Sequence, residues 1–107
     1  MTKAEATILE RLVDEALRLR GDALDVDYKA GYEEVCVMRG AVGCGIARYR
    51  SSSTDAIALR DELYQLARKR RRVVIEGDPY FLVATKRDSF GETAFRVEIR
   101  PARPARR

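Results

Sequence analysis

The sequence contains no histidine. Without an imidazole, the chain lacks Ser-His and Cys-His nucleophile pairs and histidine-ligated metal sites. General acid–base chemistry would then depend on carboxylate, lysine, tyrosine or cysteine side chains. We therefore expect a protein that is not an enzyme and that uses no cofactor. The alternative within enzyme chemistry is a small carboxylate- or cysteine-dependent enzyme.

Cysteine is scarce and long apolar runs are absent. The two cysteines, Cys36 and Cys44, are too few for a disulfide scaffold, and without other ligands they cannot form a structural zinc site. No apolar run approaches the roughly 18 residues of a membrane-spanning helix. The first residues lack the basic and apolar segments of a secretion signal. These absences predict a cytoplasmic protein with no membrane partner.

The length and the apolar content are those of one globular domain. The chain has 107 residues, of which 46% are hydrophobic, and this is enough to bury a core without metals or disulfides. We expect a single domain over residues 1–100. Pro101 and Pro104 should end regular structure, which leaves residues 101–107 as a basic, flexible tail.

The net charge of +4 is unevenly distributed along the chain. Residues 100–107 contain four arginines and no acid, and seventeen basic and seventeen acidic side chains make up the rest. The positive charge is therefore expected in a tail rather than on the body of the domain. This argues against a nucleic-acid-binding fold, which normally carries a basic face on the fold itself.

Two segments have the pattern of amphipathic helices. Apolar residues recur at spacings of three and four from Ile8 to Leu19, and Thr2 and Glu5 fit a capping box, which together predict a helix over residues 3–20. A glycine follows as a stop signal. A second helix is expected over residues 55–69, after a serine-rich stretch that offers several N-caps.

The remaining segments have the alternation or the apolar runs that are typical of strands, at residues 24–28, 32–38, 42–49, 73–75, 80–85 and 94–100. The order is then α-β-β-β-α-β-β-β, and the fold class is α+β, with two helices packed on antiparallel sheet. The αβββ order occurs twice without a residue-level repeat, so we treat it as a coincidence of order. The segment 87–91 is expected to be a loop.

Glycines mark one hairpin as a candidate interface. If residues 39–41 form a three-residue loop, Val35 and Val37 face Gly45 and Gly43 across two strands. The small residues would then let a helix or a second subunit approach closely. We take Gly43, Gly45 and the loop residue Phe90 as the candidate interface. In the same register Cys36 and Cys44 are neighbours on one face, where core packing is favoured over a redox role.

Two aspartates, Asp25 and Asp27, are the best candidates for carboxylate chemistry. Both lie on one face of a strand and would suit a magnesium ion. The alternation instead favours a solvated outer face, with the intervening apolar residues turned inward. An enzyme would need a pocket that joins these aspartates to Tyr49 or Cys44, and no spacing in the sequence requires one.

The densest charge cluster follows the second helix. We take it, with one arginine from the later loop, as the candidate site for a nucleic acid or another anion: Arg68, Lys69, Arg70, Arg71, Arg72 and Arg87. Favourable placement at a helix C-terminus is the alternative explanation of the run.

The leading hypothesis is a non-enzymatic binding or assembly module that self-associates. Three observations support it: the absence of histidine, the small residues of the hairpin, and the edge strands of a β-rich fold, which are open to pairing unless protected. The alternative is a nucleic-acid-associated protein that uses the basic cluster and the tail. An acidic protein partner would suit the same arginines.

Overall fold

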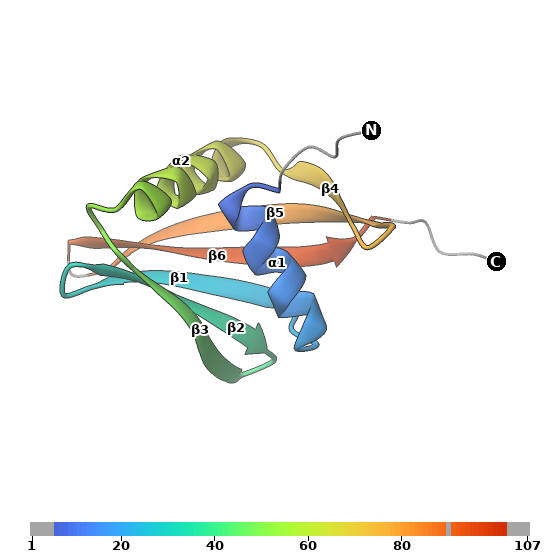
Figure 1. Ribbon diagram of the computed structural model, residues 1–107, viewed down its shortest axis with the longest axis horizontal. Helices are drawn as coiled ribbons and strands as arrows, with labels where there is room; N and C mark the ends of the chain where they lie inside the picture. Colours follow the sequence, from blue (N-terminus) through green and yellow to red (C-terminus); the bar gives the residue numbers. More distant parts are fainter. Residues whose placement is uncertain (1–5, 90, 103–107) are drawn as a thin grey trace.

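The computed structural model describes residues 6–89 and 91–102. Within these residues, two helices lie on one face of a six-stranded antiparallel sheet, which confirms the expected fold class and element order (Figure 1). The elements are α1 (Ile8–Arg18), β1 (Ala23–Lys29), β2 (Tyr32–Arg39), β3 (Val42–Arg50), α2 (Thr54–Arg68), β4 (Arg71–Ile75), β5 (Asp78–Ser89) and β6 (Glu92–Pro101). Neither helix is long and apolar enough to cross a membrane.

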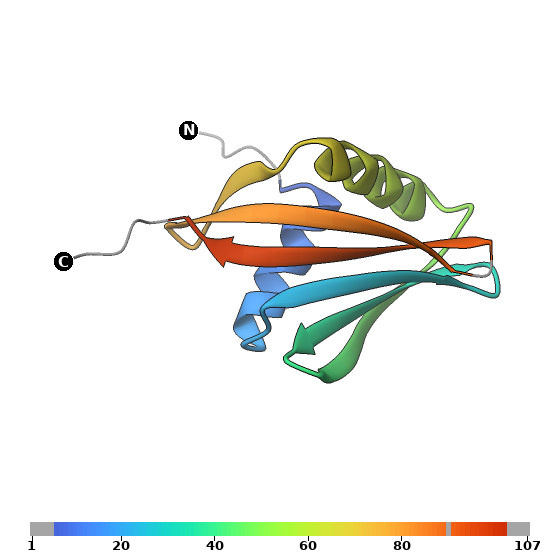
Figure 2. The same ribbon diagram turned by 180° about the vertical axis from the view of Figure 1, so that it is seen from behind.

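The strands lie in the order β3-β2-β1-β6-β5-β4, so the first and last strands are neighbours in the middle of the sheet. Across the sheet, β6, β5 and β4 follow one another in the same sense as β3, β2 and β1, and each strand runs opposite to its counterpart. We call these two groups of three strands the two meanders. A rotation that relates the two meanders would move α2 to the face opposite α1. Both helices lie on the same face, behind the sheet in Figure 2, so the two αβββ units are not related by symmetry.

The core lies between the helices and the sheet. Alternate strand residues point toward the helices because successive side chains on a strand face opposite sides. The fully buried side chains include Leu24 on β1, Val97 on β6 and Leu82 on β5, and they pack with Leu59 and Leu63 of α2. One face of the sheet is therefore apolar and covered, and the other is left for contacts with solvent or partners.

The first helix starts later than its capping-box pattern predicted. Thr7 is the N-cap, and its side chain and that of Glu10 form the reciprocal capping box. The sequence holds this pattern twice, and the copy that acts is the one directly before the apolar stripe, because helix stability comes mainly from packing that stripe. The other pair, Thr2 and Glu5, lies outside the described residues.

The last hairpin is longer and tighter than the sequence indicated. Arg87 belongs to β5, which pairs with β6 as far as Ser89 opposite Glu92, so residues 87–89 are strand rather than loop. At the other end, β6 continues to Pro101, and the N–H of Ala102 donates to the Pro79 carbonyl. A proline can occupy this position because its missing N–H matters only where a ladder bond is needed.

The β1–β2 turn carries a strain that a single substitution should relieve. Ala30 and Gly31 both have positive φ, at 51° and 86°, which is the conformation of a two-residue type I′ turn. Replacing Ala30 with asparagine should raise the free energy of unfolding by about 0.5–1 kcal/mol, because asparagine tolerates the left-handed region. Urea denaturation measures the change. The matched control is Ala41→Asn, at a turn where only the glycine has positive φ, and an equal gain there would contradict this explanation.

Candidate interaction surfaces

The face of the sheet opposite the helices is uncovered and ionic at its centre. On β1 and β6, Asp25 and Arg96 point to this open face as cross-strand partners. The Arg96 guanidinium donates two hydrogen bonds of 2.7 and 2.8 Å to the Asp25 carboxylate, and this contact raises the pKa of Arg96. Asp25 is thus held by an arginine, and the expectation that the aspartates lie on the outer face is confirmed.

The basic run after α2 is divided between the two sides of the sheet. Arg71 pairs with Leu82 and turns toward the helices, where its guanidinium donates to Glu62 at 3.0 Å. The second Glu62 oxygen accepts from the Leu9 N–H at the start of α1. Arg71 and Glu62 therefore tie α1, α2 and β4 together, and Arg71 points to the opposite side of the sheet from Arg72. The strand alternation of β4 is the reason.

Two members of the run, Arg70 and Arg72, lie on the open face beside an aromatic ring. The guanidinium carbon of Arg70 lies 4.2 Å from the centroid of the Phe81 ring. Arg72 is the cross-strand partner of Phe81 on one side, and Arg100 is its partner on the other side. A row of three arginines around one half-buried ring therefore crosses β4, β5 and β6.

Of the other candidate anion ligands, Lys69 borders a hollow together with Arg70 and Arg72, whereas Arg87 lies apart from this row. Arg87 is six residues from Phe81 along β5, a separation of about 20 Å, so the structure does not bring it to the same place. Arg68 and Lys69 are exposed at the end of α2. Sequence reasoning missed Phe81, although it placed Arg100 outward at the end of the last strand. Alternation along β5 could have placed Phe81 outward as well, but only the register brings both residues beside Arg72.

The glycine hairpin has a different register from the one expected. The β2–β3 loop has two residues, Gly40 and Ala41, rather than three, and Gly40 has a positive φ that favours a short turn. Gly45 therefore lies opposite Cys36 and Gly43 opposite Met38, on the open face rather than the helix face. Both glycines are exposed on an edge strand. The third candidate interface residue, Phe90, lies outside the described residues.

The two cysteines are not neighbours on one face. Cys36 pairs with Gly45, whereas Cys44 pairs with Val37, so the two side chains belong to opposite faces. This corrects the sequence expectation, and the shorter loop is the reason. Burial, together with nearby carboxylates, raises the pKa of the half-buried Cys36 thiol. Cys44 is exposed, so it is not a core residue.

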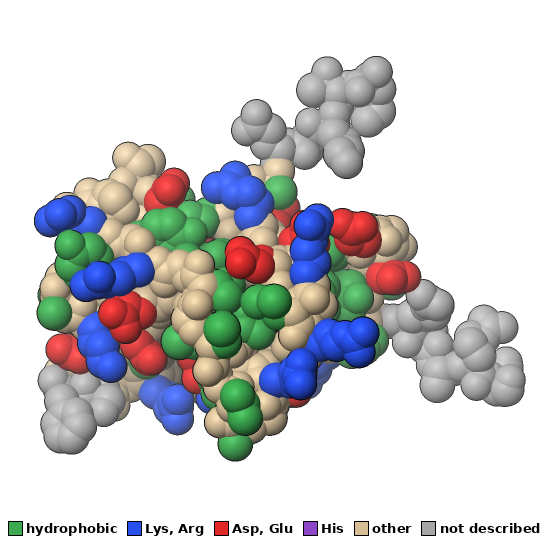
Figure 3. Space-filling model, turned by 60° about the horizontal axis from the view of Figure 1, so that its bottom comes forward, with side chains coloured by type: hydrophobic (Ala, Val, Ile, Leu, Met, Phe, Trp, Pro, Cys, Tyr) green, Lys and Arg blue, Asp and Glu red, His purple; other side chains and the backbone are tan. Residues whose placement is uncertain are grey.

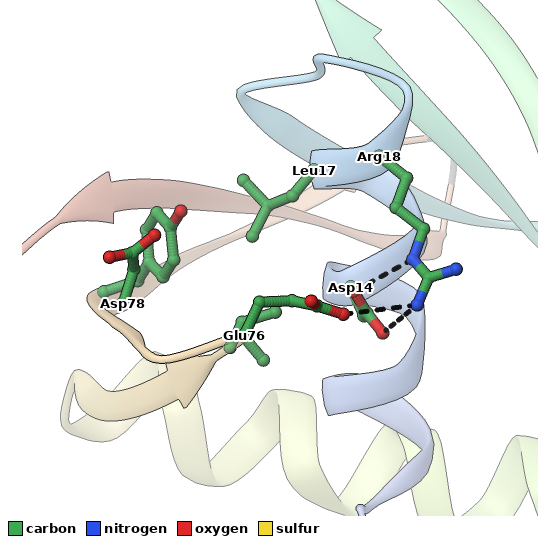
Figure 4. Close-up of a pocket in the computed structure, with 7 residues that line it drawn as sticks. Asp14, Leu17, Arg18, Glu76 and Asp78 are labelled. Carbon is green, nitrogen blue, oxygen red and sulfur yellow. Dashed lines mark hydrogen bonds and ion pairs between the residues drawn. The ribbon is translucent and has the colours of Figure 1, made fainter.

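The residues considered for enzyme chemistry are spread over both faces. Asp25 and Asp27 point to the open face, whereas Tyr49 packs against the core on the helix face, where burial raises its pKa. Among the described residues, no group of three or more cysteine, aspartate or glutamate side chains is arranged to hold a metal ion. Figure 4 shows a hollow between α1 and the β4–β5 turn, where Arg18 bridges Asp14 and Glu76 at 3.3 Å each. The contacts with Asp14 and then Glu76 raise the pKa of Arg18. The residues considered for enzyme chemistry do not line this hollow.

One ionic contact is buried on the helix side. The Glu33 carboxylate on β2 is 5% exposed, and it accepts hydrogen bonds from Arg60 of α2 at 2.8 Å and from the Ser51 hydroxyl at 2.9 Å. It joins α2 to the β2–β3 side of the sheet, far from the arginine row. Sequence reasoning did not single out this pair, because nothing in the local pattern distinguishes Glu33 from the adjacent, more exposed Glu34.

The outer edge of β3 is uncharged over its first six residues and exposed over the first four. Residues 42–47 contain no charged side chain, and Val42 is 71% exposed. Figure 3 brings this side of the molecule forward and shows hydrophobic side chains near the middle of the view, with an acidic side chain among them and basic side chains around them.

Neither a family model nor a curated protein matches this sequence. The two surfaces with the most distinctive geometry are the uncharged β3 edge and the arginine row around Phe81, and they lie at opposite sides of the sheet.

Proposed function

We propose that this protein is a non-enzymatic binding module that self-associates through β3, with the strand of one copy pairing antiparallel to β3 of a second copy. The observation that carries the proposal is the uncharged edge over residues 42–47, of which residues 42–45 are exposed. An edge strand presents unpaired N–H and C=O groups, and proteins that remain monomeric usually protect such an edge with charge, proline or a very short strand. The first four residues of β3 have none of these devices, and a β-bulge at Ile46, between the pairs Cys36–Gly45 and Val35–Ala47, ends this unprotected stretch.

The other edge of the sheet provides a comparison within the same molecule. Strand β4 has five residues, begins with Arg71 and Arg72, and follows Arg70. A short edge with charge at its start is a poor partner for another strand. This difference is the one expected if the β3 edge pairs with another strand and the β4 edge is protected against such pairing.

The composition of β3 also favours one register. Antiparallel pairing of identical strands is compatible with a two-fold axis. If the axis passes through Cys44, Val42 of one copy lies opposite Ile46 of the other, and the glycines lie opposite each other. Arg48 then falls beyond the paired segment, which avoids repulsion between like charges. A five-residue pairing buries little surface, so we expect a weak dimer whose population rises with concentration.

The first test compares two exposed valines on the two edges. Val42 is 71% exposed on β3 and Val74 is 58% exposed on β4. Light scattering after gel filtration should give a concentration-dependent mass toward twice 12.1 kDa for the wild type and for Val74→Lys. Val42→Lys should remain a monomer, because two lysines would then flank the paired strands. A wild type that stays monomeric at the highest concentration reached would contradict the proposal.

The second test uses the exposed thiol as a probe of the register. With Cys44 opposite its own copy, the two β-carbons would be about 4.5–5.5 Å apart, near the range for a disulfide. Diamide, which accepts the two electrons and two protons released, should crosslink the wild type and Cys36→Ser into dimers. Cys44→Ser should give none. Crosslinking through Cys36 alone would place the contact elsewhere.

A further inference from the structure

We propose that the row formed by Arg72, Phe81 and Arg100 on the open face, together with Arg70, binds single-stranded nucleic acid. The arginines would contact phosphates, and a base would stack on the Arg70–Phe81 pair. This site lies on β4, β5 and β6 and does not depend on pairing through β3.

The geometry supports a stacking contact. The guanidinium carbon of Arg70 already lies over the Phe81 ring, 4.2 Å from its centroid, on an uncovered sheet face. Aromatic rings and guanidinium planes on an open surface are the groups on which unpaired bases stack. The bases of a duplex are stacked on one another and are not free to do this, so the site should prefer a single strand.

The local charge supports contacts with phosphate. Among the described residues, neither Arg70 nor Arg72 has a carboxylate oxygen within 4.0 Å, whereas Arg96 on the same face is neutralised by Asp25. The nearby acid is Glu98, which binds Arg100. Two guanidinium groups beside one ring therefore lack a paired carboxylate. The overall balance of acids and bases in the sequence does not reveal this local excess of positive charge, because it is the strand register that brings these residues together.

The chain direction adds further positive charge. Ala102 donates its N–H to the carbonyl of Pro79, two residues before Phe81. The three arginines of residues 103–107 follow directly in the sequence. These arginines lie outside the described residues, so their contribution to binding is measured separately.

The experiment measures binding of a fluorescent oligothymidylate to the full chain by anisotropy, over a range of salt from about 25 to 200 mM. The key variant is Arg70→Gln/Arg72→Gln. Its matched control is Arg48→Gln/Arg50→Gln, which removes the same charge from the β2–β3 side, where both arginines lie near the Tyr32 ring. The key variant should bind at least about tenfold more weakly and lose about 1.4 from the slope of log affinity against log salt, as two phosphate contacts require. The control should change affinity less than about threefold.

Three further arms separate the sources of binding. Phe81→Leu should weaken binding several-fold with the salt slope unchanged, because it removes stacking and leaves the cations. Arg103→Ser/Arg106→Ser/Arg107→Ser should make the affinity depend less steeply on salt. The preference for a single strand over a duplex should remain. Val42→Lys should bind like the wild type, which distinguishes this site from the proposed dimer contact.

Several results would overturn the proposal. These are no binding by the wild type at low salt, equal losses in the two double arginine variants, tighter binding of a duplex of the same length, or equal binding of polyglutamate. Polyglutamate offers negative charge without bases, so equal affinity would assign the row to an acidic protein partner. Circular dichroism of each variant confirms that a loss of binding is not a loss of fold.

Discussion

Replacing Gly21 with alanine is expected to lower the free energy of unfolding by about 2–3 kcal/mol. A β-carbon at this position would lie 2.3 Å from the Cγ1 atom of Val37, 3.1 Å from the Met38 carbonyl oxygen and 3.3 Å from the Ala16 carbonyl oxygen. Val37 is buried and its β-branched side chain has little rotamer freedom. Neither it nor the two backbone groups can move without disturbing the packing of α1 on β2.

The matched control for this substitution is Gly45→Ala. An added β-carbon there meets no atom within 4 Å, and the backbone does not have positive φ. It should change the free energy of unfolding by no more than about 0.5 kcal/mol, and urea denaturation compares the two variants directly. Equal losses at Gly21 and Gly45 would mean that glycine is needed for backbone conformation rather than for close approach.

Replacing Arg60 with leucine is expected to lower the free energy of unfolding by about 2–4 kcal/mol. The substitution would leave the buried Glu33 carboxylate with the Ser51 hydroxyl as its remaining side-chain donor. The Arg60 side chain is 35% exposed, so water reaches part of the vacated space and keeps the loss toward the lower end. The physical cause is the uncompensated charge rather than the loss of an attractive contact.

A double variant separates these two causes. Glu33→Leu/Arg60→Leu removes both charges, and its stability should lie within about 1 kcal/mol of the wild type, since a buried ion pair can be replaced by apolar packing at little cost. Arg48→Leu, which breaks the exposed contact with Glu34, should cost less than about 1 kcal/mol. If the double variant is as unstable as Arg60→Leu, the hydrogen-bonded pair itself stabilises the fold.

Local pattern was sufficient for the elements and their order. The alternation in β6 correctly places Phe95, Val97 and Ile99 toward the core, because a half-buried strand must alternate every second residue. The stripe on α1 likewise predicted its buried face. Errors occurred at the ends, where Thr7 rather than Thr2 begins the helix and where β5 includes Arg87. The ends of helices and strands depend on which residues form the turn, and the sequence was compatible with several turns.

The candidate sites depend on information that no local pattern contains. A one-residue difference in the β2–β3 loop moved Gly43 and Gly45 to the open face and separated Cys36 from Cys44. The run of basic residues is continuous in sequence, yet β4 turns Arg71 to the helix side and Arg72 to the open face. Register and alternation act together here, and a shift of one residue reverses every side chain.

By itself, the sequence determined that the described residues form two helices and six strands, that the core is apolar and that histidine chemistry is absent, because composition and periodicity are local properties. Only the tertiary structure decided that Arg72, Phe81 and Arg100 lie side by side, that the uncharged first part of β3 lies at an edge of the sheet and that Gly21 must have no side chain. These features join residues that are distant in the chain, and their proximity results from which strands pair and in which register.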